Sequence, residues 1–203
     1  MAVQFITGLG QEDQLVKLLA NDNLLGHNEP RFAFLGRSNV GKSSLLNALT
    51  RTKSAFVSKK PGHTREVNFF LWEDMKVVLA DLPGYGFAKA TKQARNQWSQ
   101  NIDAYLRNDK GLNLAFILLD ARHGPTDLDL ELFSYLSKLK IPMCPIMTKN
   151  DKLKTQKLRH QRKQFVKAAF EEMGVNPEAI IWSSSEKGHG INQIKSLIRE
   201  RIS

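Results

Sequence analysis

A short glycine-rich segment contains the residues that indicate chemistry most clearly. Residues 36–43 read G-R-S-N-V-G-K-S, which fits the pattern G-x-x-x-x-G-K-[ST]. The glycines let the backbone curl, so that successive N–H groups point toward phosphate oxygens, and the start of a following helix adds positive potential. Lys42 then reaches the β- and γ-phosphates, and the Ser43 hydroxyl binds Mg²⁺. The segment predicts a binding site for the phosphates of a nucleotide.

A second segment, D-L-P-G at residues 81–84, supplies further groups for such a site. The Asp81 carboxylate can hold Mg²⁺ through a water molecule, and the backbone N–H of Gly84 can contact the γ-phosphate. The pattern D-x-x-G is common by itself. Its position after a predicted strand and downstream of the glycine-rich segment makes it more specific, so we expect Asp81 and Gly84 at the phosphate end of the site.

A third segment, T-K-N-D at residues 148–151, predicts which base the nucleotide carries. A carboxylate at Asp151 can accept hydrogen bonds from both the ring N–H and the exocyclic amine of guanine. Adenine presents neither donor in that arrangement, so its binding would leave a desolvated charge unpaired. Lys149 can lie over the base and brace the glycine-rich segment. In this order along the chain, the three segments predict a site for GTP.

The hydrophobic pattern indicates the elements that position these segments. Apolar runs predict six strands, and helical spacing predicts five main helices, with a further short amphipathic segment around Leu15, Leu18 and Leu19. The predicted strands cover residues 31–35, 67–72, 76–80, 114–119, 143–147 and 180–182. Alternating strands and helices form a mostly parallel sheet covered on both faces. Ligands bind at the carboxyl ends of such strands, and all three segments fall there.

The fold class predicted from this pattern is α/β, with a single domain, and the family resemblance given below implies that this domain is of the P-loop GTPase (Ras-like) type. We expect a six-stranded, mostly parallel sheet in which a hairpin at residues 67–80 makes one strand antiparallel. No repeat or linker divides the chain. We therefore assign residues 31–203 to the GTPase domain and residues 1–30 to an N-terminal extension with a short helix.

Composition narrows the setting of the protein. The longest nearly apolar stretch, residues 112–119, is too short to span a membrane, and the first ten residues lack the order of a signal peptide. The single cysteine, Cys144, can form no internal disulfide and lies in an apolar run, as expected of a core residue in a reducing compartment. We expect a cytoplasmic monomer with no membrane span.

The charge of the chain suggests a polyanionic partner. The formal net charge is +10, and residues 152–167 contain seven Lys or Arg and no acidic residue, so this window supplies most of it. A basic helix of this kind either binds a polyanion or is simply a solvated surface.

Four further motifs make the sequence recognisable. They are P-G-H-T-R at residues 61–65 with Asn68 after it, D-L-P-G-Y-G-F-A at residues 81–88, D-A-R-H-G-P-T-D-L-D at residues 120–129, and Ser184, Ser185, Gly190 and Ile191 near the C-terminus. With the glycine-rich segment and T-K-N-D, they make the chain resemble the YihA/EngB (YsxC) family of ribosome-assembly GTPases, within the translation-factor-type (Era/TrmE-like) small GTPases. The resemblance runs from about Phe32 to Ile202.

The resemblance implies a set of site residues. Thr64 would complete the Mg²⁺ shell together with Ser43 and with Asp81, which acts through water. The resemblance does not decide which of Ser183 to Ser185 touches the base. The residues expected to contact the nucleotide are Gly36, Arg37, Ser38, Asn39, Val40, Gly41, Lys42, Ser43, Ser44, Gly62, His63, Thr64, Asp81, Leu82, Pro83, Gly84, Thr148, Lys149, Asn150, Asp151, Ser183, Ser184 and Ser185.

The catalytic candidates are Lys42, Thr64, Gly84 and Asn39. Ras-like proteins carry a glutamine after D-x-x-G that orients the attacking water, whereas this chain has Tyr85 there, so we expect slow hydrolysis by the free protein. Related GTPases use an asparagine at the position of Asn39 to hold a K⁺ ion. Alternatively, Asn39 only stabilises the loop through a side-chain to backbone hydrogen bond. Arg65 is a further candidate for a stabilising charge.

The implied function is a GTP-dependent switch in assembly of the large ribosomal subunit, linked through the family to cell division and septation. Ribosomal RNA is then the natural partner of residues 152–167. Two alternatives remain: a P-loop phosphotransferase acting on a small acceptor, and a GTPase switch that only protein effectors recognise.

Overall fold

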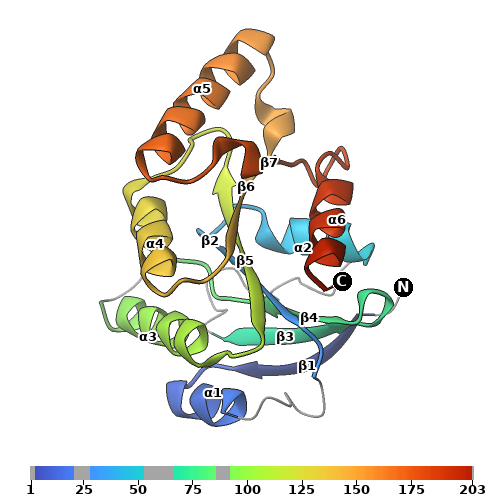
Figure 1. Ribbon diagram of the computed structural model, residues 1–203, viewed down its shortest axis with the longest axis vertical. Helices are drawn as coiled ribbons and strands as arrows, with labels where there is room; N and C mark the ends of the chain where they lie inside the picture. The colour runs from blue at the N-terminus through green and yellow to red at the C-terminus, as the bar shows by residue number, and fades with distance from the viewer. Residues whose placement is uncertain (1–2, 21–27, 53–65, 86–91, 203) are drawn as a thin grey trace.

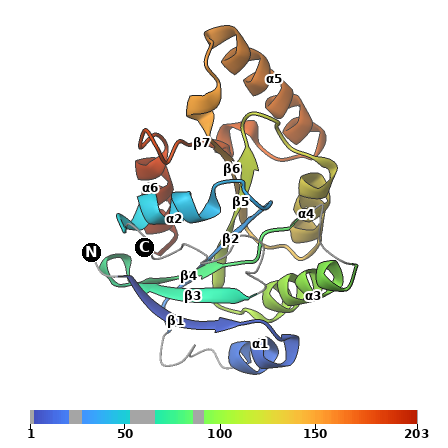
Figure 2. The same cartoon turned by 180° about the vertical axis from the view of Figure 1, so that it is seen from behind.

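The computed structural model describes residues 3–20, 28–52, 66–85 and 92–202, which form one sheet with helices on both of its faces (Figures 1 and 2). The strands are β1 (Val3–Leu9), β2 (Arg31–Gly36), β3 (Val67–Trp72), β4 (Val77–Asp81), β5 (Leu112–Asp120), β6 (Met143–Thr148) and β7 (Ile181–Trp182). The helices are α1 (Glu12–Leu19), α2 (Lys42–Thr50), α3 (Lys92–Asn108), α4 (Asp127–Lys138), α5 (Gln156–Glu172) and α6 (Ile191–Ile202).

The sheet confirms the predicted α/β class and corrects the number of strands. Its order is β1-β3-β4-β2-β5-β6-β7, and β3 pairs antiparallel with both of its neighbours while the remaining pairs are parallel. The prediction of six strands is wrong because β1 adds a seventh at the edge. This strand was missed because it is only partly buried, with Phe5 55% exposed and its pairing shifted between Phe5 and Thr7. Its alternation of apolar and polar residues is therefore weak.

Two hydrophobic clusters hold the helices against the sheet. On one face, buried residues of α1, α3, α4 and α5 pack together, among them Leu15, Tyr105, Phe133 and Phe170. On the other face, α2 and α6 pack through residues such as Leu46 and Ile194. Figure 2 shows this division, with α2 and α6 on the side of the sheet opposite α3 and α4. Because both faces are covered, the central strands are buried and read as continuous apolar runs.

Local signals fix several element boundaries as the sequence predicts. The predicted hairpin is β3 and β4, joined by the short 3₁₀ helix Glu73–Met75. Thr126 precedes α4 in an extended conformation, and the Asp129 carboxylate accepts a hydrogen bond from the Thr126 N–H at 2.8 Å. Gly174, with φ of +70°, follows α5 and ends it.

The apolar side predicted for α5 is only partly buried. Val166 and Phe170 are fully buried, whereas Leu158 is 38% exposed and Phe165 is 51% exposed. The helical spacing that predicts an apolar side for α5 includes Leu158 and Phe165, but neither of them is buried in the core. The reason lies in the position of the helix: α5 lies at one end of the long axis of the molecule (Figure 1), so only part of it packs on the core.

Candidate functional site

The glycine-rich segment forms a tight loop between β2 and α2. Gly36 is buried at the end of β2, where a Cβ atom would lie 2.8 Å from the Val40 side chain and 3.0 Å from the backbone of Leu118. Gly41 has φ of +105° and stands just before the first residue of α2, Lys42. Both glycines are therefore required by space or by backbone conformation. The loop presents the N-terminus of α2 to its centre, which suits an anion.

The D-L-P-G segment lies directly against this loop. The Ser38 N–H donates a hydrogen bond to the Tyr85 carbonyl at 3.0 Å, and the Tyr85 N–H donates to the Gly36 carbonyl at 3.2 Å. The Lys42 ammonium is paired with the Asp81 carboxylate, and both side chains are largely buried. The structure thus brings together the lysine expected at the phosphates and the carboxylate expected at Mg²⁺.

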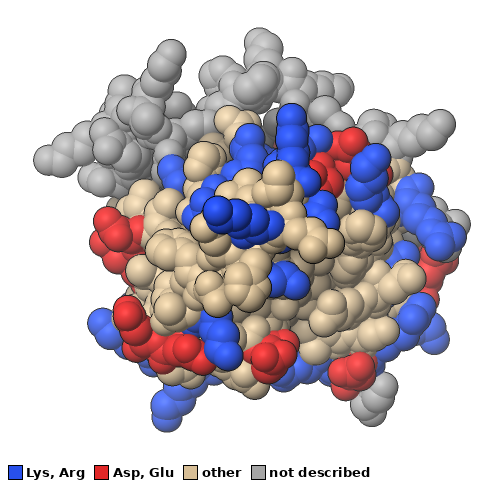
Figure 3. All heavy atoms as spheres, turned by 90° about the horizontal axis from the view of Figure 1, so that it is seen from above, with Lys and Arg blue, Asp and Glu red and all other residues tan. Residues whose placement is uncertain are grey.

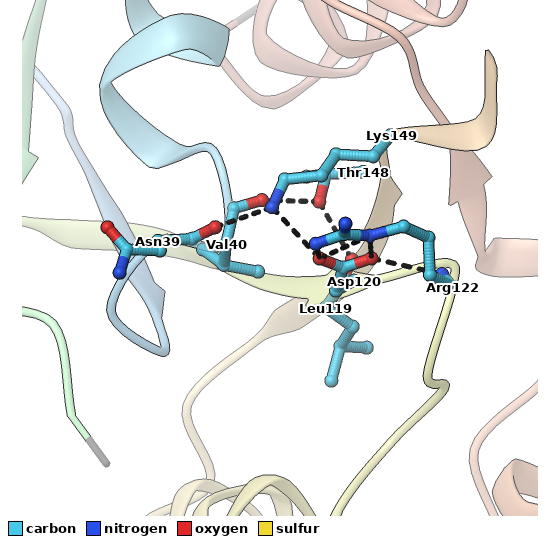
Figure 4. Close-up of polar contacts among 7 residues, drawn as sticks. All are labelled: Asn39, Val40, Leu119, Asp120, Arg122, Thr148 and Lys149. Atoms are coloured by element: carbon cyan, nitrogen blue, oxygen red, sulfur yellow. Dashed lines mark hydrogen bonds and ion pairs between the residues drawn. The ribbon is translucent and has the colours of Figure 1, made fainter. Parts of the chain in front are cut away.

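The T-K-N-D segment is bonded to the same loop from the other side (Figure 4). The Thr148 hydroxyl lies 2.6 Å from the Val40 carbonyl and 3.0 Å from the Leu119 carbonyl. The Lys149 ammonium donates to the Asn39 carbonyl at 2.6 Å. Because Lys149 has a left-handed backbone, with φ of +56°, its side chain leaves the end of β6 toward the loop. The base end and the phosphate end are therefore parts of one hydrogen-bonded unit.

Sequence reasoning assigned no role to Asp120, which is a central residue of this unit. Its carboxylate accepts a hydrogen bond from Lys149 at 2.9 Å and a two-pronged contact from the Arg122 guanidinium at 2.7 and 2.9 Å (Figure 4). Burial alone would raise the pKa of Asp120, but the hydrogen bonds from Arg122 and Lys149 hold that pKa well below its ordinary value. The signal that identifies it is an aspartate at the end of a buried strand, two residues before an arginine.

Asp151 is held ready as a hydrogen-bond acceptor. The Ser184 hydroxyl donates to its carboxylate at 2.6 Å, and the Lys152 ammonium lies 3.1 Å from the second oxygen. Burial opposes ionisation, yet the hydrogen bonds from Ser184 and Lys152 keep the pKa of Asp151 below its ordinary value. Asp151 therefore carries a negative charge at neutral pH, as recognition of two guanine N–H groups requires.

The three serines after β7 differ in what they contact. Ser183 is fully buried, with its N–H donating to the Met147 carbonyl at 2.8 Å and its carbonyl accepting from Asn150 at 3.0 Å. Ser184 is also buried and is the one whose hydroxyl reaches Asp151. Ser185 is partly exposed. The structure therefore brings Ser184 to the T-K-N-D segment through its side chain and Ser183 through its backbone.

Tyr85 points away from the phosphate loop and toward α4. Its hydroxyl donates to Asp129 at 2.8 Å, in the first turn of that helix. Burial and the neighbouring Asp129 carboxylate raise the pKa of Tyr85 well above its ordinary value, so the phenol stays neutral. A neutral phenol bonded to α4 has no amide to orient a water molecule.

The donor set at the phosphate end fits Mg²⁺. Asp81, whose carboxylate is paired with Lys42, supplies one carboxylate, and Ser43, the next residue of α2, supplies one hydroxyl, which is the sparse protein contribution that Mg²⁺ shares with phosphates. Among the residues that the structure describes, no cluster of three or more His, Cys, Asp or Glu forms a separate metal site. Gly62, His63, Thr64 and Arg65 lie outside the described residues.

Asn39 is exposed in the phosphate loop, whereas Cys144 is buried in the core. Asn39 is exposed, with φ of +63°, and its amide makes no hydrogen bond within the described part of the chain, so the proposed side-chain bond that stabilises the loop is not present there. Cys144 is buried in the core, and burial raises the pKa of its thiol to about 12, which keeps the thiol protonated.

Comparison with known protein families finds a match to the part of the chain that contains the glycine-rich and D-L-P-G segments. A family model described as "50S ribosome-binding GTPase" matches residues 31–149, which is more than half of the chain. No helix in the described residues is both long enough and apolar enough to cross a bilayer.

Curated relatives and a solved structure extend the similarity to most of the chain. The probable GTP-binding protein EngB of Natranaerobius thermophilus is 42% identical over 171 residues, which cover 84% of this chain and 86% of that protein. The protein of the same name from Thermotoga maritima is 44% identical over 170 residues, covering 82% and 83%. The crystal structure of a probable GTP-binding protein engB superposes with a TM-score of 0.69 at 28% identity, covering 85% of this chain and 98% of that one.

Proposed function

The chain belongs to the EngB family of GTP-binding GTPases, and on that premise we propose that it acts as a GTP-dependent switch in assembly of the large ribosomal subunit. The observation that supports the proposal is that hydrogen bonds join the segment expected to bind the base to the loop expected to bind the phosphates. Lys149 and Thr148 of the guanine-reading segment are bonded to the backbone of Asn39 and Val40. The loop expected to hold the phosphates is therefore braced by the segment expected to bind the base.

The proposed residue roles follow from this arrangement. Asp151 selects guanine, with Ser184 holding its carboxylate in place. Lys42 leaves Asp81 and moves to the β- and γ-phosphates when the nucleotide binds. Ser43, Thr64 and, through water, Asp81 would hold Mg²⁺, which when bound neutralises phosphate charge during hydrolysis. Gly84 contacts the γ-phosphate through its backbone and reports the loss of that phosphate to the residues after it.

Hydrolysis by the free protein is slow in this proposal because Tyr85 supplies no water-orienting amide. The exposed Asn39 side chain then holds K⁺ at the phosphate loop, and Arg65 is an alternative source of positive charge. Comparison of GTP turnover in K⁺ and Na⁺ buffers tests the ion: faster turnover in K⁺ supports it, and equal rates remove it.

The ribosomal part of the proposal is supported by charge. The basic residues of the 152–167 window give α5 an exposed positive surface, which suits ribosomal RNA of a large-subunit precursor in the cytoplasm. The link to septation follows from the family resemblance. We propose a monomer, because one chain contains all the described parts of the site.

Two experiments separate this function from its alternatives. Calorimetry with GDP and ADP tests base selection: comparable affinities would favour a phosphotransferase of another specificity. Cosedimentation with ribosomal subunits in GTP and in GDP, at increasing salt, tests the partner. Nucleotide-dependent binding that weakens steeply with salt is expected for RNA. Binding that is insensitive to salt would favour a switch that protein effectors recognise.

A further inference from the structure

An exposed aromatic ring lies on the basic surface of α5. Phe165 is 51% exposed, and Leu158, two turns earlier on the same side of the helix, is 38% exposed. Figure 3 looks onto this end of the molecule, and it shows Lys and Arg side chains gathered among uncharged residues while most Asp and Glu lie toward the margins. A single exposed apolar side chain is ordinary on a protein surface, so the case for a partner rests on how this ring is held and on the charges around it.

The Phe165 ring is held in a defined position. A Cβ atom on Gly124 would lie 2.7 Å from the ring, so the loop before α4 packs closely against one edge. The Arg162 guanidinium lies over the ring, 5.6 Å from its centre, and Arg162 is itself fixed by a hydrogen bond to the His123 carbonyl at 2.8 Å. Cation–π contact and this packing orient the ring before any partner arrives.

The charges around the ring fit a polyanion. Residues 152–167 contain no acidic side chain, and Lys154 and Lys157 are exposed without an ion pair to any residue that the structure describes. Phosphates can therefore bind these lysines without displacing a protein carboxylate. A protein partner would need a matching acidic surface, and it would favour a continuous apolar patch over one ring and one leucine, two turns apart, with cations beside them.

We propose that Phe165 is a stacking platform for an unpaired base of RNA, and that the lysines of α5 hold the neighbouring phosphates. The inference rests on the proposed contact between α5 and RNA and adds the kind of RNA that is bound. Single-stranded RNA can turn a base outward onto an aromatic ring, whereas the bases of a duplex stay stacked on one another. The Phe165 face therefore distinguishes single-stranded segments from helices.

The test uses the full chain with two fluorescent probes, a 12-nucleotide oligoadenylate and a 12-base-pair RNA duplex. Binding is followed by anisotropy for the wild type and for Phe165→Ala, Phe165→Tyr and Phe165→Leu. Leu128→Ala is the matched control, because Leu128 is an exposed apolar residue, 47% exposed, on the neighbouring helix α4. Guanine-nucleotide binding reports the folding of every variant, since Phe165 contacts none of the site residues described above.

The expected results are specific to a stacked base. Phe165→Ala weakens binding of the single strand by about 5- to 100-fold and leaves duplex binding within about twofold. Phe165→Tyr retains single-strand binding, whereas Phe165→Leu loses it although the side chain remains apolar. Leu128→Ala changes neither probe.

Three results would overturn the inference. Wild-type affinity of Phe165→Leu for the single strand would show that the surface binds through apolar contact, as for a protein. An equal loss for both probes would show that phosphates alone are recognised. A wild-type protein that binds neither probe would remove the proposed RNA contact itself, and that result is distinct because it appears before any variant is compared.

Discussion

Two regions of this molecule are rich in cations, and they use them in opposite ways. Around the T-K-N-D segment, Lys149 and Arg122 are both paired with Asp120. Lys152 is paired with Asp151 and with Glu186, the latter at 2.7 Å. At the α5 surface, Lys154, which lies just before the helix, and Lys157 have no ion pair among the described residues. Paired cations orient hydrogen-bonding groups for one small ligand, whereas unpaired cations attract a large anion without fixed geometry.

The difference has an energetic consequence for mutations. In the nucleotide site, carboxylates such as Asp120 and Asp151 are bonded to several other side chains, so removal of one carboxylate leaves its partners unsatisfied. On the α5 surface, each lysine acts almost independently and is screened by salt. Substitutions in the first region should therefore have large and specific effects, and those in the second should have small effects that accumulate.

The largest effect is expected for Asp151→Asn. An amide can accept only one hydrogen bond from guanine and directs its own donors at the second guanine donor, so GDP affinity should fall by at least about 100-fold, measured by calorimetry. Xanthosine diphosphate provides the control, because its base offers an acceptor where guanine carries the amine. Recovery of binding with xanthosine diphosphate would show an intact pocket, and unchanged GDP affinity would break the assignment of Asp151.

The next effect is expected for Asp120→Asn. Loss of the carboxylate frees Lys149 and Arg122, so GDP affinity should fall by about tenfold and the free energy of unfolding by about 1–3 kcal/mol at pH 7. Arg122→Ala is the matched control: it removes one partner but keeps the Lys149 contact, so its effect on GDP affinity should be smaller. Equal GDP affinities of wild type and Asp120→Asn would contradict the role of Asp120 in placing Lys149.

The stability difference between wild type and Asp120→Asn should depend on pH. Burial opposes ionisation, but the contacts with Arg122 and Lys149 hold the folded-state pKa of Asp120 below its unfolded value. The stabilisation is therefore complete above the ordinary aspartate pKa of about 3.9 and is lost as pH falls through the folded value. Urea unfolding between pH 7 and pH 3 should show a constant difference that shrinks only at the acidic end. A difference that shrinks above pH 5 would argue against this ion pair.

A smaller effect is expected for Tyr85→Phe. Removing the hydroxyl leaves the buried Asp129 carboxylate one hydrogen bond short, so the free energy of unfolding should fall by about 1–2 kcal/mol, measured by urea titration. GTP turnover should stay within about twofold of wild type, because the hydroxyl points to α4. A large loss of turnover would place this hydroxyl in catalysis instead.

The smallest effect is expected for Lys157→Ala on α5. Nucleotide affinity should be unchanged and the free energy of unfolding should shift by no more than about 0.5 kcal/mol. RNA affinity should fall modestly, and the slope of its salt dependence should decrease by about one. Gln161→Ala, an exposed neutral residue of the same helix, should leave that slope unchanged. A nucleotide-binding defect in Lys157→Ala would contradict the inference that the α5 surface acts independently of the nucleotide site.

The sequence was most informative where the chemistry is local. The three loop segments and the parallel sheet were predictable because glycine positions, a following helix and buried apolar runs are all read over a few neighbouring residues. The edge strand β1 was not, because its order comes from pairing with β3, whose paired residues lie 58 to 69 positions further along the chain. The exposure of Phe165 likewise depends on where α5 meets the core and not on its apolar spacing.

The role of Asp120 was also beyond a local reading. Its partner Lys149 lies 29 residues further along the chain. Asn39, whose carbonyl accepts a hydrogen bond from Lys149, lies 110 residues before Lys149. Such contacts depend on the strand order, which brings the ends of β2, β5 and β6 together. The sequence motifs identify the candidate site residues, and the strand order determines which of them contact one another.

The pairing of Lys42 with Asp81 neutralises both charges within the phosphate end of the site. A triphosphate that binds Lys42 replaces Asp81 as the partner of the ammonium group. The net affinity of the triphosphate therefore includes the difference in free energy between these two pairings. The carboxylate can release that ammonium without loss only if another cation takes its place. With Mg²⁺ as the proposed cation, binding of nucleotide and of cation would thereby be coupled, and chelation of the cation should accelerate exchange of bound nucleotide rather than merely slow its hydrolysis.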